Sequence, residues 1–216
     1  MPDVKHFDPD VALERVERLF WRDGAATTSI QAVTAATGLN RSSLYATFGG
    51  KRQLYLAALR RYLRLRSRPV CEAIARDERG LPAVRDFFAA LIDLRCTGEH
   101  ARWGCMLVNA YAAGEAADPE VGAILDEHHE RLRGALRTAL ETARARGQLA
   151  PGVAADVTAE TLVLLAYGVN LRSRAGASPE ALHRTVAATL GSLAGHAGRT
   201  GPTDHTGPTD HTDHTG

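Results

Sequence analysis

The apolar residues of this chain recur every three to four positions, which is the spacing of one face of an α-helix, and no run alternates as a half-buried strand does. The first such stretch begins at Asp8-Pro9 and ends at Gly24, because Asp is a favoured N-cap, Pro suits the first helical turn and Gly readily stops a helix. Its inward face carries Ala12, Val16, Leu19 and Phe20. An all-α protein is therefore expected.

Two short helices follow. Thr28 and Gln31 have the spacing of a capping box, so the first is expected to start at Thr28 and to end at Gly38. The second is expected to start at Asn40, a good N-cap, and to run to about Phe48. Two short helices joined by a tight turn are the helix-turn-helix arrangement, in which the second helix enters the major groove of DNA.

A long fourth helix is expected from Lys51, and Pro69 should kink or end it. Its buried face is expected to carry Tyr55, Ala58, Tyr62 and Leu65. Further helices are expected at about residues 81–97, 103–117, 119–146, 155–174 and 179–194. The pattern predicts a helix-turn-helix DNA-binding domain in residues 1–52, a larger helical ligand-binding and dimerisation domain in 53–197, and a low-complexity tail in 198–216 that is not expected to order.

Charge is distributed unevenly along the chain. Residues 1–68 carry 12 Lys and Arg against 6 Asp and Glu, while the remainder carries 14 against 19. No acidic residue lies between Asp23 and Glu72. Such a segment is either a phosphate-binding surface or a solvated basic helix face.

The second short helix has the chemistry to read a base. Its inward face carries Leu44 and Phe48, whereas Ser42, Tyr45 and Ala46 point outward. Arg41, in the first turn, can offer two hydrogen bonds to guanine N7 and O6. The candidate DNA-binding residues are Thr28, Ser29, Gln31, Arg41, Ser42, Ser43, Tyr45, Thr47 and Lys51. The alternative is a three-helix bundle whose polar surface is incidental.

The segment TSIQAVTAATGLNRSSLYATFGGKRQLYLAAL, with the preceding DPDVALERVERLFWRDG, resembles the N-terminal domain of the TetR family of regulators. The resemblance covers about residues 8–60 and includes the spacing of Gly38, Leu44-Tyr45, Phe48 and Lys51. It implies an all-helical homodimer whose third helix reads an operator, whose last two long helices form a four-helix dimer bundle, and whose DNA is released by a ligand. Many relatives carry His or a bulky aromatic where Ala46 and Thr47 stand, so one or two phosphate contacts are expected to be missing.

The C-terminal region is large for a dimerisation device alone, and its aromatic residues suit a small hydrophobic or aromatic ligand. The candidate ligand-binding residues are Phe88, Leu91, Trp103, Cys105, Met106, Asn109, Tyr167 and Asn170. The alternative is that they are ordinary core. Trp103-Gly104-Cys105 also resembles a subset of the family in which this cysteine reports on electrophiles or oxidants; the other interpretation is a buried, inert thiol.

The dimer interface is expected in the helices at about 155–174 and 178–194. The residues expected to be buried across or beside the twofold axis are Leu162, Leu165, Val169, Val186, Leu190 and Leu193.

Other classes of protein fit the sequence less well. We expect no signal peptide, because residues 1–10 contain no apolar run, and no membrane span, because the apolar stretch 161–169 is too short to cross a bilayer. The three cysteines form no disulfide or zinc pattern, which favours a cytoplasmic location. His128-His129, between Glu127 and Glu130, is the one hint of a metal site, but no second ligand set matches it, and we expect these side chains to be solvated. No enzyme motif, metal or cofactor is expected. A DNA-binding protein without a ligand is the remaining alternative.

Overall fold

The computed structural model describes residues 8–195, and within them every regular element is a helix, apart from an isolated bridge between Leu149 and Ala194. The N-terminal helices are α1 (Pro9–Asp23), α2 (Ile30–Thr37), α3 (Arg41–Phe48) and α4 (Lys51–Tyr62). The others are α5 (Arg68–Arg76), α6 (Leu81–Cys96), α7 (Met106–Ala112), α8 (Pro119–Ala145), α9 (Ala155–Arg174) and α10 (Pro179–Leu193). The predicted all-α class is confirmed. The predicted tail at 198–216 lies outside the described residues.

Helices α4 and α5 are joined by a π-helical turn, Leu63–Ser67, instead of a break. Pro69, the second residue of α5, accounts for this turn, because a proline has no N–H and its ring clashes with the carbonyl oxygen four residues earlier. The chain thus runs without interruption from Lys51 to Arg76. The predicted burial of Leu65 is wrong, since this residue lies in the π turn and is 51% exposed.

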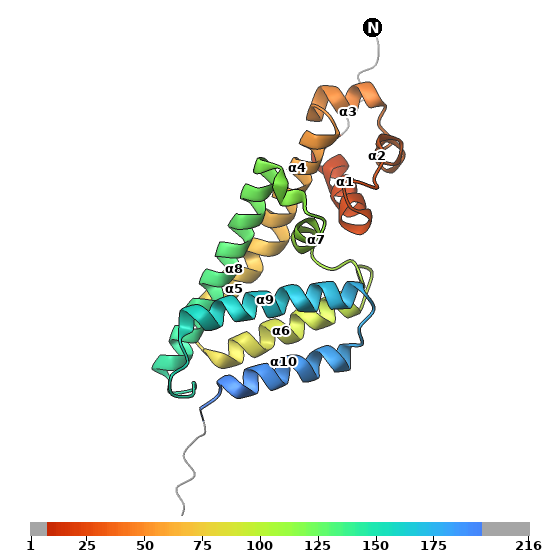
Figure 1. Ribbon diagram of the computed structural model, residues 1–216. Helices are drawn as coiled ribbons and strands as arrows, with labels where there is room; N and C mark the ends of the chain where they lie inside the picture. The colour runs from red at the N-terminus through yellow and green to blue at the C-terminus, as the bar shows by residue number, and fades with distance from the viewer. Residues whose placement is uncertain (1–7, 196–216) are drawn as a thin grey trace, which may run out of the picture.

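Two hydrophobic cores lie along this long helical segment. The first joins α1, α2, α3 and α4 to α7 and the start of α8, so it extends across the expected domain boundary at residue 52. The second is formed by α5, α6, the rest of α8, α9 and α10. Figure 1 shows α8 running beside the α4–α5 segment, with α3 at one end of the molecule and α10 toward the other. The element expected to enter DNA is therefore at the tip farthest from the second core.

The helix expected at about 103–117 is shorter than predicted. Residues Met106–Ala112 form α7, and a separate 3-10 turn covers Glu115–Ala117. The preceding backbone is not helical, because Gly104 has φ 68° and its carbonyl oxygen accepts a hydrogen bond from the Trp21 indole at 2.9 Å. A side chain cannot replace this glycine easily, since a Cβ would lie 2.9 Å from Asn109 Oδ1.

Candidate functional site

Helices α2 and α3 are fixed by caps that the sequence supplies locally. Ser29 Oγ accepts a hydrogen bond from the Ala32 amide at 3.1 Å, and Asn40 Oδ1 accepts one from the Ser43 amide at 2.8 Å. Between the helices Gly38 adopts φ 74°, in the left-handed region that favours glycine. Leu44, 1% exposed, holds α3 against the first core. The opposite face of α3 is left open.

Most of the candidate DNA-binding residues lie on this open surface. The exposed ones are Ser29, Gln31, Arg41, Ser42, Tyr45 and Thr47, and the partly exposed ones are Ser43 and Lys51. The Arg41 guanidinium lies over the Tyr45 ring at 5.1 Å from its centroid. Lys51 is the first residue of α4, whose N-cap Gly50 provides no side-chain hydrogen bond. The positive charge of Lys51 therefore lies beside the free N–H groups at the start of α4, and both favour a bound phosphate.

Thr28 is the exception, and the predicted helix start was one residue too early. Its side chain is 2% exposed, and its hydroxyl donates to Gly24 O at 2.7 Å, so it cannot donate to a phosphate. The cap is Ser29, one position later. Thr28 and Ser29 are both favoured N-cap residue types. Because the Thr28 side chain is buried and bonded to Gly24, Ser29 is the one that caps α2.

Most arginines of the basic segment between Asp23 and Glu72 are paired with carboxylates and are not available to bind phosphate. Arg52 contacts Asp118 at 2.7 Å and Glu120 at 2.9 Å. The other cations with carboxylate partners are Arg60 with Glu120, Arg61 with Glu14 and Glu17, Arg66 with Glu17, and Arg68 with Glu127. Five arginines of this segment therefore bind α1, α8 and the residue before α8, whereas Arg41, Lys51 and Arg64 have no such partner among residues 8–195.

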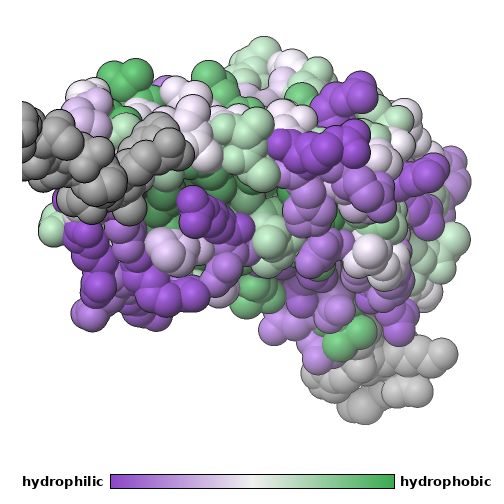
Figure 2. All heavy atoms as spheres, turned by 90° about the horizontal axis from the view of Figure 1, so that it is seen from below, coloured by the Kyte–Doolittle hydropathy of each residue, from purple (hydrophilic) through white to green (hydrophobic). Residues whose placement is uncertain are grey.

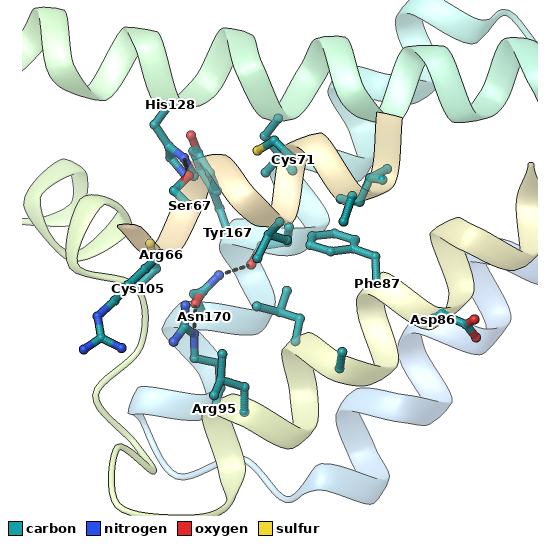
Figure 3. Close-up of a pocket in the computed structure, with 18 of the residues that line it drawn as sticks. Arg66, Ser67, Cys71, Asp86, Phe87, Arg95, Cys105, His128, Tyr167 and Asn170 are labelled. Carbon is teal, nitrogen blue, oxygen red and sulfur yellow. Dashed lines mark hydrogen bonds between the residues drawn. The ribbon is translucent and has the colours of Figure 1, made fainter. Parts of the chain in front are cut away.

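A cavity of about 390 Å³ lies between the α4–α5 segment, α6, α8 and α9. Of the candidate ligand-binding residues, Leu91, Cys105, Tyr167 and Asn170 line it, whereas Phe88, Trp103, Met106 and Asn109 do not. Phe88 and Met106 are buried in the two cores, and Asn109 Nδ2 donates to Trp103 O at 2.8 Å. Figure 3 shows Phe87 directed into the space between α5 and α6.

The sequence reasoning missed two polar cavity residues. Arg95 is 7% exposed; its Nε donates to Asn170 Oδ1 at 2.7 Å and its Nη2 to Tyr62 OH at 3.3 Å. His128, 6% exposed, lies 2.8 Å from Ser67 Oγ through Nδ1, so the prediction that it is solvated is wrong. Burial, with a smaller repulsion from His129 and Arg95, lowers the pKa of His128 to about 4. The sequence does contain one indication that Arg95 is buried: it lies seven residues after Phe88, and therefore on the same apolar face of α6.

Trp21 connects this cavity to the DNA-binding helices. It belongs to α1, is 2% exposed and lines the cavity. Its ring stacks on His100 at 4.8 Å between centroids, and the guanidinium groups of Arg66 and Arg95 lie over it at 4.9 and 5.7 Å. A change in the cavity can therefore reach α1 through one side chain.

Cys105 occupies the N-cap position of α7, not its first turn, and is 4% exposed. Its side chain nevertheless lines the cavity. A small molecule in the cavity would therefore lie next to this thiol.

Two family models match the chain. The one described as bacterial regulatory proteins, tetR family, matches residues 13–58, and the one described as tetracyclin repressor-like, C-terminal domain, matches residues 80–189. The chain belongs to the TetR family. Its membership makes it a DNA-binding transcriptional regulator and not an enzyme, as predicted.

Curated relatives extend over most of this TetR-family chain. The HTH-type transcriptional repressor ComR of Escherichia coli (strain K12) is 29% identical over 187 residues, 86% of this chain and 89% of ComR. The uncharacterized HTH-type transcriptional regulator YezE of Bacillus subtilis (strain 168) is 30% identical over 145 residues, 67% of this chain and 74% of YezE.

Solved structures share the fold. A cysteine mutant of the TetR-family regulator CifR, complexed with 26-base-pair operator DNA, has a TM-score of 0.73 at 23% identity, covering 88% of this chain and 98% of CifR. The reduced form of E. coli NemR has a TM-score of 0.72 at 18% identity, covering 85% of this chain and 96% of NemR.

None of the helices in residues 8–195 is long and apolar enough to cross a membrane. The same residues contain no cluster of His, Cys, Asp or Glu that could hold a metal ion.

Proposed function

We propose that this TetR-family regulator is a repressor that binds a palindromic operator as a dimer and leaves it when a small molecule occupies the cavity. The observation that carries the proposal is the exposed polar face of α3, with Arg41 and Lys51 unpaired within residues 8–195, whereas five of the arginines between residues 52 and 68 pair with carboxylates. Similarity to the repressor ComR supports the sign of regulation, and the operator complex of CifR supports duplex DNA as the partner.

In this proposal Arg41 reads a base and Lys51 holds a phosphate. Arg41 leaves the Tyr45 ring to donate two hydrogen bonds to guanine in the major groove. Lys51 and the open amides of the first α4 turn contact the backbone of the DNA, which fixes the depth of α3 in the groove. Ser42, Ser43 and Thr47 provide further short donors on the same helix.

A second copy of the chain is proposed to cover the outer face of α9. Val157, Leu164 and Leu171 are 69%, 60% and 40% exposed and recur every seven residues on that helix. Of the six residues expected at the interface, Leu162, Val169, Val186 and Leu190 are already buried in the second core of one chain. Figure 2, which views the molecule from below relative to Figure 1, shows hydrophobic residues between hydrophilic ones on this side.

The cavity is proposed to act on the DNA through α1 and the α4–α5 segment. The π turn places Ser67 on the cavity, while Lys51 is at the DNA end of the same continuous segment. Trp21 gives a second contact with the cavity from α1. In the dimer, operator binding requires a particular distance between the two α3 helices. A ligand that binds more tightly to a dimer with a different distance weakens operator binding, and a preference of about 1–3 kcal/mol lowers operator affinity by 5- to 150-fold.

Selection of bound duplexes from a random pool tests this function. The expected result is a twofold-symmetric site whose half-site centres are about one helical turn, or a multiple of it, apart. A selected site with one unrepeated motif, or no enriched site at all, contradicts the proposal. Addition of hydrophobic compounds to the protein–operator complex then tests release, because a ligand of the DNA-free state lowers operator affinity.

A further inference from the structure

Arg95 is a buried cation without a buried anion. The residue is 7% exposed, and neither of its hydrogen-bond partners, Asn170 Oδ1 and Tyr62 OH, is a carboxylate. Within residues 8–195 its Nη1 donates no hydrogen bond and no carboxylate lies within 4.0 Å of the guanidinium. The Trp21 ring, 5.7 Å from the guanidinium carbon, compensates part of this buried charge, but an aromatic face is not an anion, and a buried charge is costly unless an opposite charge balances it.

Neither Tyr62, His128 nor the two carboxylates that line the cavity supply the missing charge. Burial raises the pKa of Tyr62, so its hydroxyl is neutral at pH 7. His128 is also neutral there, because burial lowers its pKa to about 4. Asp77 and Asp86 line the cavity, but both contact Arg79, at 2.6 and 2.8 Å. Figure 3 shows Asp86 on the far side of the cavity from Arg95.

The rest of the cavity is built for an apolar body. The helices contribute aliphatic and aromatic walls, which include Val70, Ile74, Phe87, Leu91 and Leu132. Its volume of about 390 Å³ is within the usual range for a small-molecule site. Arg95 and Asn170 point toward one another from α6 and α9 at one side of this space (Figure 3). Tyr167 OH, on the same wall, has no hydrogen-bond partner in the described chain.

We propose that the ligand of this cavity is a small organic carboxylate, whose carboxylate binds Arg95 and whose apolar part lies among Phe87, Leu91 and Leu132. The inference rests on the proposed function, since it names the chemical class of the ligand at that site. A guanidinium matches the two oxygens of a carboxylate, and a single buried cation balances a single negative charge. A phosphate monoester carries nearly two charges at pH 7 and needs more cationic partners than this wall supplies.

Paired acids and amides test the charge directly on the full-length protein without DNA. Calorimetric titrations would use the straight-chain acids from butanoate to dodecanoate, phenylacetate and 4-phenylbutanoate, each beside its own primary amide. At least one acid should bind about tenfold or more tightly than its amide, the difference expected for hydrogen bonds to a charged group. If no acid in the series binds better than its amide, the proposal is overturned without any variant having to fold.

Variants then locate the preference. Arg95→Met keeps the aliphatic stem but removes the charge, and it should reduce the preference for the acid to less than about threefold. Arg76→Met is the matched control, because it makes the same change of net charge at a residue of α5 whose side chain is 78% exposed and does not line the cavity. This control should keep the wild-type preference. A folded Arg95→Met protein that still prefers the acid contradicts the assignment.

Failure of the inference is distinguishable from failure of the proposed function. An acid that binds through Arg95 but leaves operator affinity unchanged supports the ligand class and contradicts ligand-induced release. Neutral amides that bind as well as the acids and release the operator support the proposed function and contradict the carboxylate.

Discussion

Trp21→Phe is expected to destabilise the protein far more than the same change at the other tryptophan. The Trp21 ring is 2% exposed, and its Nε1 donates to the buried Gly104 carbonyl at 2.9 Å. Phenylalanine leaves this carbonyl oxygen without its partner, which costs about 1–3 kcal/mol. The smaller ring adds about 1 kcal/mol or more if the surrounding aromatic side chains do not collapse into the vacated space. The free energy of unfolding should therefore fall by about 2–4 kcal/mol.

Trp103→Phe provides the control, since the sequence contains only these two tryptophans. The Trp103 ring is partly exposed, and its indole N–H makes no hydrogen bond to any residue in 8–195. Its replacement should cost less than about 1 kcal/mol. Urea denaturation followed by far-UV circular dichroism measures both changes without relying on tryptophan fluorescence. Equal costs for the two variants, or a cost below about 1 kcal/mol for Trp21→Phe, would refute the tie between α1 and the segment before α7.

The burial of His128, the exposure of Leu164 and the unequal burial of the three cysteines can each be measured in solution. Because His128 takes up a proton near pH 6.5 when unfolded and near pH 4 when folded, stability should fall by about 1.4 kcal/mol per pH unit as the pH drops between these values, and His128→Gln should remove this part of the slope in denaturant titrations. Leu164→Glu should convert the dimer into monomers by analytical ultracentrifugation, whereas Leu65→Glu, at a similarly exposed leucine, should not; a dimeric Leu164→Glu protein places the interface elsewhere. In a thiol titration of the native protein Cys96 should react first, because the other two cysteines are buried; reaction of all three at one rate contradicts that burial.

Local signals predicted the helices well, because caps and turns are encoded by neighbouring residues. Asn40 and Gly38 place the turn between α2 and α3, and Leu44 identifies the buried side of α3. The helix at 155–174 was also predicted with its observed bounds. These features depend on residues within one or two helical turns, so a single sequence is sufficient to find them.

Long-range contacts account for what the sequence did not reveal. The pairing of Arg52 with Asp118 joins residues 66 positions apart, and periodicity gives no sign of it. Helix α7 begins late because Gly104 is held by Trp21, which is 83 positions away. Arg95 lies on the apolar face of its helix, where charge alone predicts solvent, and only the packing of α6 against α9 shows that it faces a cavity.

The central claim is that α3 reads the operator, and repeated selection of bound DNA with two variants tests it most directly. Arg41→Ala should lose preference at one base position in each half-site, at a cost of about 1–3 kcal/mol, while the rest of the site is retained. Lys51→Ala should weaken binding to all sequences, leave base preferences unchanged and lower the salt dependence by about one unit for each phosphate that is no longer neutralised. If Arg41→Ala instead weakens all sequences equally and the selected site is unchanged, Arg41 is a phosphate contact and the account of base reading by α3 is wrong.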